Sequence, residues 1–287
     1  MTLALALKLM IVVSVILMLF ALSLRARLAD LGYLFTHWRL GIGAFVAMFV
    51  IVPAAAIAIS YFFDLNPAVK IALVAIALSP IPPILPNKQI KAGARACYIT
   101  GLLFAATIAS IFVAPAGLYL ASRLFDFDAH IGFAAIAMPL LLTILLPLVL
   151  GIAIAPLLSE GHLEKLSGFA SKLGGGLMLV AAVGLLIMIF PRMLDVIGHG
   201  ALLALAVLVL VGLAAGFALG GPDPGDRAAL GLATSTRHPG VALAIAANVF
   251  PDNQLAPAAI LLSLLVAMVV CIPFMRLIRK QQGFAEV

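Results

Sequence analysis

Residues 230–250 read LGLATSTRHPGVALAIAANVF, an apolar run that polar residues interrupt near its middle. The run is about as long as a bilayer crossing, and a cation at membrane depth usually faces a partner, a cavity or a substrate path. Pro239 has no amide donor and Gly240 is conformationally permissive, so we expect the helix to break here. The alternative is a loop outside the membrane between two short helices, each of which is too short to cross alone.

The polar residues at this break are the candidate site residues, because a broken helix with a charge at its break is a common design of transporter binding sites. Arg237 would attract an anion or replace a coupling cation. His238 would contact the substrate or carry a proton, since histidine titrates near physiological pH. The hydroxyls that would supply polar contacts are those of Thr234, Ser235 and Thr236.

The composition is that of an all-α membrane protein. Of the 287 residues, 65% are hydrophobic and 10% are charged, whereas about a quarter of the residues of a soluble domain are charged. We therefore expect a single integral membrane domain over residues 1–287, in contact with the lipid bilayer. The two cysteines form no C-x-x-C pair, and we expect no cofactor and no metal site. The net charge of +6 lies mainly in short loops, as in membrane proteins, and does not indicate nucleic-acid binding.

Nine apolar segments predict about nine transmembrane helices. They cover about residues 2–24, 41–63, 67–92, 96–122, 132–157, 166–191, 198–221, 225–249 and 254–277. With the N-terminus outside, the outer loops contain Arg123 and Arg192, and most other basic residues fall in the inner loops and the C-terminal tail. This asymmetry follows the positive-inside rule. It predicts a multi-pass protein of the plasma membrane or cell inner membrane with a cytoplasmic C-terminus.

A second break is predicted at residues 78–93, which read LSPIPPILPNKQIKAG. Four prolines within seven residues leave no regular helix, and the freed carbonyl groups need donors from protein or water. Asn87 is the predicted polar contact on this side. Two breaks, one in each half of the chain, are typical of an inverted repeat whose breaks meet at the binding site. The residues expected to keep the helices broken are Pro80, Pro82, Pro83, Pro86, Pro239 and Gly240.

Two blocks of the sequence resemble the bile acid:sodium symporter family. Residues 24–80, LRARLADLGYLFTHWRLGIGAFVAMFVIVPAAAIAISYFFDLNPAVKIALVAIALSP, are similar to its basic link, its helix with an inner proline and its first crossing segment. Residues 225–250, GDRAALGLATSTRHPGVALAIAANVF, resemble its second crossing helix.

The resemblance implies a panel domain, about residues 2–63 and 132–191, and a core domain, about residues 67–122 and 198–277, that rock against each other. The broken helices would cross in the core, and an organic anion would bind at the cleft.

The chain differs from the sodium-coupled members where they carry polar residues. A glutamine of those members corresponds to Met48, a glutamate to Ala233, and a glutamine and an asparagine to Arg237 and His238. Sodium needs oxygen ligands, and a positive Arg237 would repel a cation at short range. The resemblance therefore argues against the usual Na+ coupling. Two substitutes for a bound Na+ remain open: the fixed charge of Arg237, or a proton (H+) carried by His238. If Na+ does bind, main-chain carbonyls and hydroxyls are the oxygens left to coordinate it.

We expect a secondary active transporter of a small organic anion that works by alternating access. The spans contain no paired carboxylates and no nucleophile with a base, so we expect no enzyme. The alternatives are a channel-like or regulatory anion-binding membrane protein, or an arsenite-type or auxin-type carrier on a similar scaffold. An arsenite-type carrier would use a thiol, and Cys97 and Cys271 show no placement for one. The substrate, the coupling ion and the oligomeric state stay open.

Overall fold

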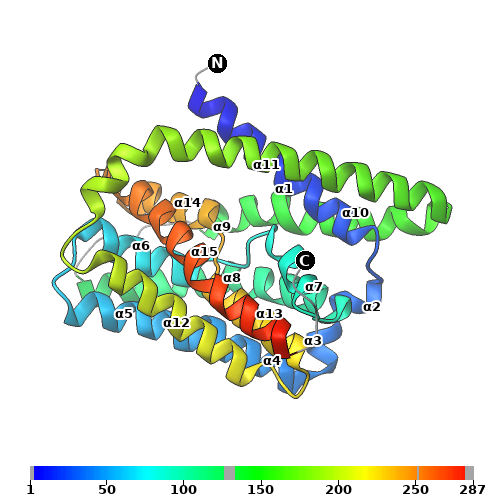
Figure 1. Ribbon diagram of the computed structural model, residues 1–287, viewed down its shortest axis with the longest axis horizontal. Helices are drawn as coiled ribbons and strands as arrows, with labels where there is room; N and C mark the ends of the chain where they lie inside the picture. Colours follow the sequence, from blue (N-terminus) through cyan, green and yellow to red (C-terminus); the bar gives the residue numbers. More distant parts are fainter. Residues whose placement is uncertain (1–2, 126–132, 251, 282–287) are drawn as a thin grey trace.

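The computed structural model describes residues 3–125, 133–250 and 252–281, and every secondary-structure element in these ranges is helical (Figure 1). Within these ranges, seven helices are long and apolar enough to cross a bilayer: Leu5–Ser23, Trp38–Phe62, Ala96–Phe125, Ala137–Leu157, Glu160–Val196, Ala201–Leu219 and Ala256–Ile278. The prediction of an all-α, multi-pass membrane protein is confirmed. The count of about nine spans stays a prediction, because the two other apolar segments are interrupted.

The continuous segments begin and end close to the predicted bounds. Two of them contain a π-helical turn followed by a proline: α4 (Trp38–Val46), η1 (Ala47–Ile51) and α5 (Val52–Phe62), and α9 (Phe133–Leu140), η2 (Leu141–Leu145) and α10 (Leu146–Ile154), which ends in η3 (Ala155–Leu157). The others are α1 (Leu3–Ser23), α8 (Ala96–Phe125), α11 (Glu160–Val196), α12 (Ala201–Leu219) and α15 (Ala256–Gln281). The link after α1 forms α2 (Leu28–Leu31) and α3 (Tyr33–Thr36).

Each interrupted segment consists of two short helices around a non-helical stretch. In the first, α6 (Pro67–Leu78) and α7 (Leu85–Lys91) flank residues 79–84; in the second, α13 (Pro224–Ser235) and α14 (Pro239–Val249) flank residues 236–238. Of the predicted helix-breaking residues, Pro80, Pro82 and Pro83 lie within the first break. Pro86, Pro239 and Gly240 lie in the first turns of α7 and α14, where a proline begins a helix well because its missing N–H would be unpaired anyway.

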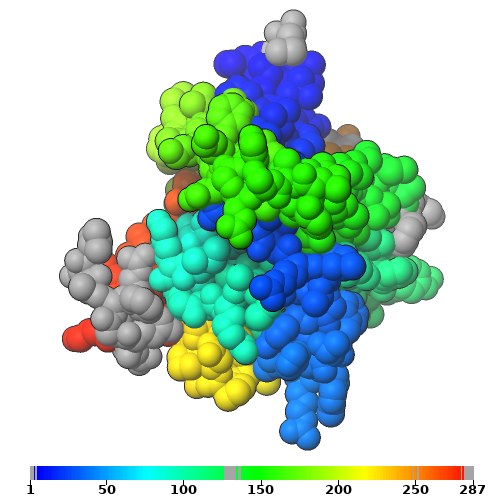
Figure 2. Space-filling model, turned by 90° about the vertical axis from the view of Figure 1, so that its right-hand side faces the viewer, coloured from blue at the N-terminus to red at the C-terminus, as the bar shows by residue number. Residues whose placement is uncertain are grey.

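The helices form two outer groups with the interrupted segments between them (Figure 1). α1 packs along α11 and α10, and α12 packs on α13, α15 and the span of α4 and α5. Figure 2 shows dark-blue α1 and green α11 lying together above the cyan region around α7. Residues 38–62 also pack on α6 and α8. The two halves of the proposed 2–63 panel thus have different neighbours, and the division into panel and core stays a prediction.

Candidate functional site at the meeting of the two breaks

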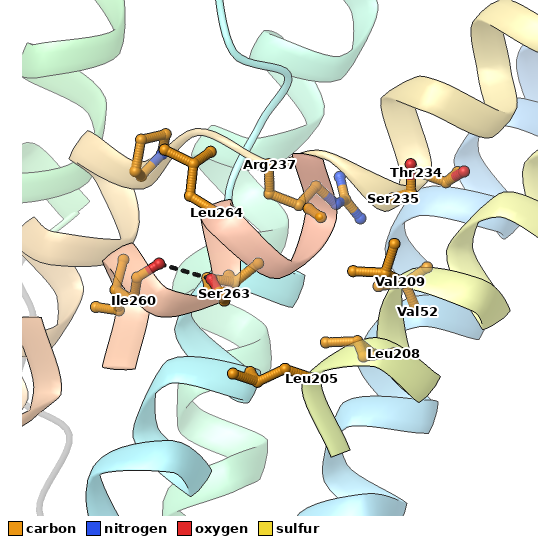
Figure 3. Close-up of a pocket in the computed structure, with 13 residues that line it drawn as sticks. Val52, Leu205, Leu208, Val209, Thr234, Ser235, Arg237, Ile260, Ser263 and Leu264 are labelled. Atoms are coloured by element: carbon orange, nitrogen blue, oxygen red, sulfur yellow. Dashed lines mark hydrogen bonds between the residues drawn. The ribbon is translucent and has the colours of Figure 1, made fainter. Parts of the chain in front are cut away.

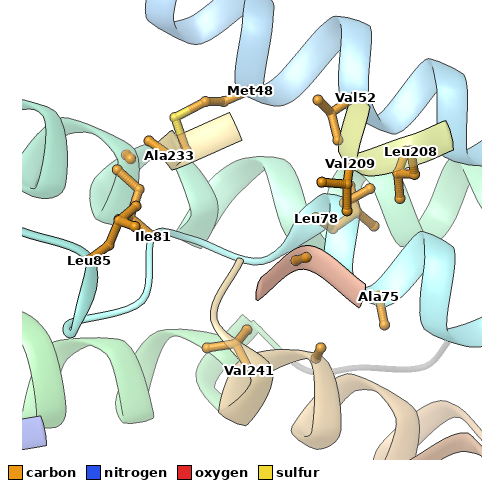
Figure 4. Close-up of a cluster of buried hydrophobic side chains, with 14 of the residues drawn as sticks. Met48, Val52, Ala75, Leu78, Ile81, Leu85, Leu208, Val209, Ala233 and Val241 are labelled. Carbon is orange, nitrogen blue, oxygen red and sulfur yellow. The ribbon is translucent and has the colours of Figure 1, made fainter. Parts of the chain in front are cut away.

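The two breaks lie against each other. The backbone N–H of His238 donates to the carbonyl oxygen of Pro80 at 2.8 Å. α6 packs on α14 and α7 packs on α13, so the interrupted segments cross at this point. Figure 4 shows the chain between Leu78 and Leu85 passing the residues that lead into α14, with the buried side chains of Met48, Val52 and Val241 around it.

Arg237 joins three elements at the crossing. It is 4% exposed. Its Nη1 donates to the carbonyl oxygen of Ser79 at 3.1 Å, and its Nη2 donates to the carbonyl oxygen of Met48. The guanidinium carbon lies 5.5 Å from the centroid of the Phe49 ring. Its Nε has no hydrogen-bond partner. The ion pair found among the described residues joins Arg95 and Asp226, so no carboxylate of these residues pairs with Arg237.

The sequence explains why these two carbonyls need a donor. In η1, the N–H of Val52 bonds to the carbonyl of Ala47, five residues back. In that register the carbonyl of Met48 would need the N–H of residue 53, which is a proline. Ser79 follows the end of α6 and precedes Pro80, so its carbonyl lies in the break. An unpaired buried carbonyl is costly. The guanidinium therefore satisfies two carbonyls that prolines leave without helical donors.

A cavity of about 30 Å³ lies beside Arg237 (Figure 3). Its polar lining comes from Arg237, Thr234, Ser235 and Ser263, and its other walls are apolar side chains, mainly of α12 and α15. This volume holds one or two water molecules or a small ion, and it is too small for an organic anion. Two larger hollows of about 360 and 560 Å³ are apolar, run along α4, α5 and α8, and share Phe49.

The predicted hydroxyl residues differ in their placement. The Thr234 hydroxyl is buried, and carbonyls of its own helix and of Gly212 in α12 lie within hydrogen-bond distance as acceptors for its single proton. Glycines of α12 allow this close packing, since a Cβ on Gly216 would lie 2.4 Å from Thr234 Oγ1. Ser235 Oγ donates to the carbonyl of Leu232 at 3.1 Å. Both residues line the cavity, whereas half-buried Thr236 and exposed Asn87 do not.

His238 caps the second half of the interrupted helix. Its Nδ1 accepts a hydrogen bond from the backbone N–H of Gly240 at 3.1 Å, at the start of α14. Its Nε2 is buried and has no hydrogen-bond partner among the described residues. The neutral ring that fits this geometry carries its proton on Nε2 and leaves Nδ1 as the acceptor. His238 thus stabilises two features: its backbone N–H bonds the two breaks together, and its ring caps the beginning of α14.

A second link between the interrupted segments involves residues that the sequence did not single out. Asp226, in the first turn of α13, is fully buried. Arg95 donates to it from Nε at 3.0 Å and from its backbone N–H at 3.3 Å. The hydrogen bond to Asp226 raises the pKa of Arg95. Gln89 of α7 donates to the carbonyl of Ala229 at 2.9 Å. A carboxylate inside an apolar crossing segment was the available signal, because a buried acid needs a partner.

The profile of the Sodium Bile acid symporter family matches residues 12–198, which is well over half of the chain. The chain belongs to this family. A search of curated proteins finds no match.

The predicted family is confirmed, and the chain is a membrane transporter of the bile acid symporter family. The matched residues include the first interrupted segment and end before α12, so Arg237 and His238 lie beyond them. No group of three or more His, Cys, Asp or Glu that could hold a metal ion is found in the described ranges of this symporter-family chain. The oxygens that accept from Arg237 at the crossing are two main-chain carbonyls, those of Ser79 and Met48.

Proposed function

We propose that this protein is a secondary active transporter of a small organic anion, in which Arg237 is a permanent cation at the place of a coupling Na+. The observation that carries the proposal is the pair of hydrogen bonds from one guanidinium to the carbonyls of Ser79 and Met48, on two different segments. Carbonyl oxygens are hard ligands of the kind that Na+ requires. A second cation beside Arg237 would be repelled by several kcal/mol at short range.

The geometry favours this role of Arg237 over direct binding of the organic anion. Both Nη atoms donate to main-chain carbonyls, and the adjoining cavity of about 30 Å³ has no room for an organic molecule. We propose that the substrate binds instead between the group of α1, α10 and α11 and the crossing helices, and that alternating access moves these two groups relative to each other. α4 and α5 move with the crossing helices, since they pack on α6 and α12.

His238 supplies a route for proton coupling. Protonation places a hydrogen on Nδ1, which then no longer accepts from the N–H of Gly240. Uptake of a proton therefore loosens the first turn of α14, which begins beside the crossing. Histidine is suited to this role because its ordinary pKa lies near physiological pH.

The test is uptake by the purified protein in proteoliposomes, with labelled cholate and a set of labelled mono- and dicarboxylates. We expect a pH gradient to concentrate at least one anion inside, in the absence of Na+. His238→Asn keeps a side-chain acceptor for the N–H of Gly240 and removes the titration. It should lose pH-driven accumulation and retain exchange of labelled for unlabelled anion. Accumulation that requires a Na+ gradient would contradict the proposed coupling, and flux that never exceeds equilibrium would indicate a channel.

A further inference from the structure

We infer that the small cavity beside Arg237 binds a monovalent inorganic anion of the size of chloride. The inference goes beyond the proposed function, which needs only the cation. An arginine side chain stays protonated in proteins. A buried charge needs compensation, and no carboxylate of the described residues pairs with Arg237. Two carbonyl dipoles and the face of Phe49 lower the cost but leave a full positive charge.

The cavity offers the donors that such an anion requires. The Nε–H of Arg237, which is 4% exposed, has no acceptor among the described residues, and Arg237 lines the cavity. Figure 3 shows Arg237 between Ser263 of α15 and Ser235 of α13. Both serines are buried and line the cavity. Ser263 Oγ donates to the carbonyl of Ile260 at 2.6 Å, and rotation of this hydroxyl would direct its proton to an anion instead.

The remaining walls of the cavity favour a small inorganic anion over a metal cation or an organic acid. They are apolar and belong to several elements, including Leu205, Leu208 and Val209 of α12. In such low-dielectric surroundings, the attraction between an anion and the guanidinium is much stronger than in water. A metal cation would be repelled by the same charge. The volume of about 30 Å³ admits one ion and excludes the body of an organic acid.

The test is the melting temperature of the purified protein as chloride replaces gluconate at constant Na+ concentration and ionic strength. A ligand that binds the folded state stabilises it by RT ln(1 + [L]/Kd), so the rise should saturate. We expect an increase of about 5 °C or more once chloride exceeds Kd by about a hundredfold. Bromide should act like chloride. An unchanged melting temperature would overturn the inference.

Two variants separate this site from a general effect of the salt. Ser263→Val removes a cavity hydroxyl and leaves the two carbonyl bonds of Arg237 in place, so it should abolish most of the chloride dependence. Ser110→Val is the matched control, because Ser110 is a buried serine of α8 that donates to the carbonyl of Ala106 at 2.9 Å and does not line the cavity. It should keep the dependence. Equal dependence in both variants would contradict the assignment.

A direct measurement covers the case in which Ser263→Val fails to fold. The wild-type protein, crystallised in bromide, should show an anomalous peak within hydrogen-bond distance of Arg237 Nε. A difference map without a peak there would overturn the inference. Neither outcome bears on whether Na+ drives transport, so the failure of this inference is distinguishable from the failure of the proposed function.

Discussion

Replacement of Arg237 by methionine should destabilise the fold, because methionine has no side-chain N–H group and two buried carbonyls lose their donor. A buried polar group left without a partner costs about 1–3 kcal/mol in soluble proteins. Hydrogen bonds between helices in a membrane are worth less, about 0.6 kcal/mol on average. For two carbonyls we therefore expect a loss of about 1–6 kcal/mol in the free energy of unfolding. Loss of the buried charge opposes this effect, but Pro53 and the break at Ser79 deny the carbonyls any helical substitute.

The assay is reversible unfolding in mixed micelles, followed by far-UV circular dichroism at a fixed chloride concentration. Arg237→Lys keeps a charge and one donor group, so its loss of stability should be smaller than that of Arg237→Met. Arg192→Met is the control, because Arg192 is exposed on α11 and its replacement should change the free energy of unfolding by less than about 0.5 kcal/mol. An Arg237→Met protein as stable as the wild type would refute the role of the guanidinium as the donor for these carbonyls.

Three further changes test the surrounding structure. Asp226→Asn should lower the free energy of unfolding by about 1–3 kcal/mol, below the usual cost of breaking a buried pair because the side chain of Arg95 is 46% exposed; thermal unfolding of the variant and of wild type checks this. Gly216→Val should disrupt the contact between α12 and α13 and reduce folded yield in size-exclusion chromatography, whereas Gly175→Val, which meets open space, should not. Pro53→Ala should restore a helical donor near η1, so that a double-mutant cycle with Arg237→Met shows coupling and not additivity in the free energy of unfolding.

Much of the fold follows from local rules that act on single residues. Four prolines within seven residues forbid a helix around residue 80, and Pro239 after a polar pair begins a new one, so the interruptions could be predicted. Apolar length predicts the continuous helices. The neighbours of residues 38–62 could not be predicted in this way, because packing depends on which surfaces meet and not on hydropathy.

The residues of the candidate site could be predicted from the sequence, but their hydrogen-bond and ion-pair partners could not. Arg237 and His238 stood out as polar groups in an apolar run. One of the two partners of Arg237, however, is the carbonyl of Met48, which a proline five residues later leaves without a helical donor. A carbonyl has no signature of its own in the sequence. Asp226 and Arg95 are far apart in the chain, and only the packing of α13 on α7 and α8 brings them together.

The most direct test of the central claim is the melting temperature of the purified protein as Na+ replaces choline, with chloride and ionic strength held constant. Arg237 as the permanent cation at the crossing predicts a flat curve, because no Na+ site remains to stabilise the folded state. A melting temperature that rises with Na+ and saturates would show that Na+ binds the folded protein, and it would contradict the claim.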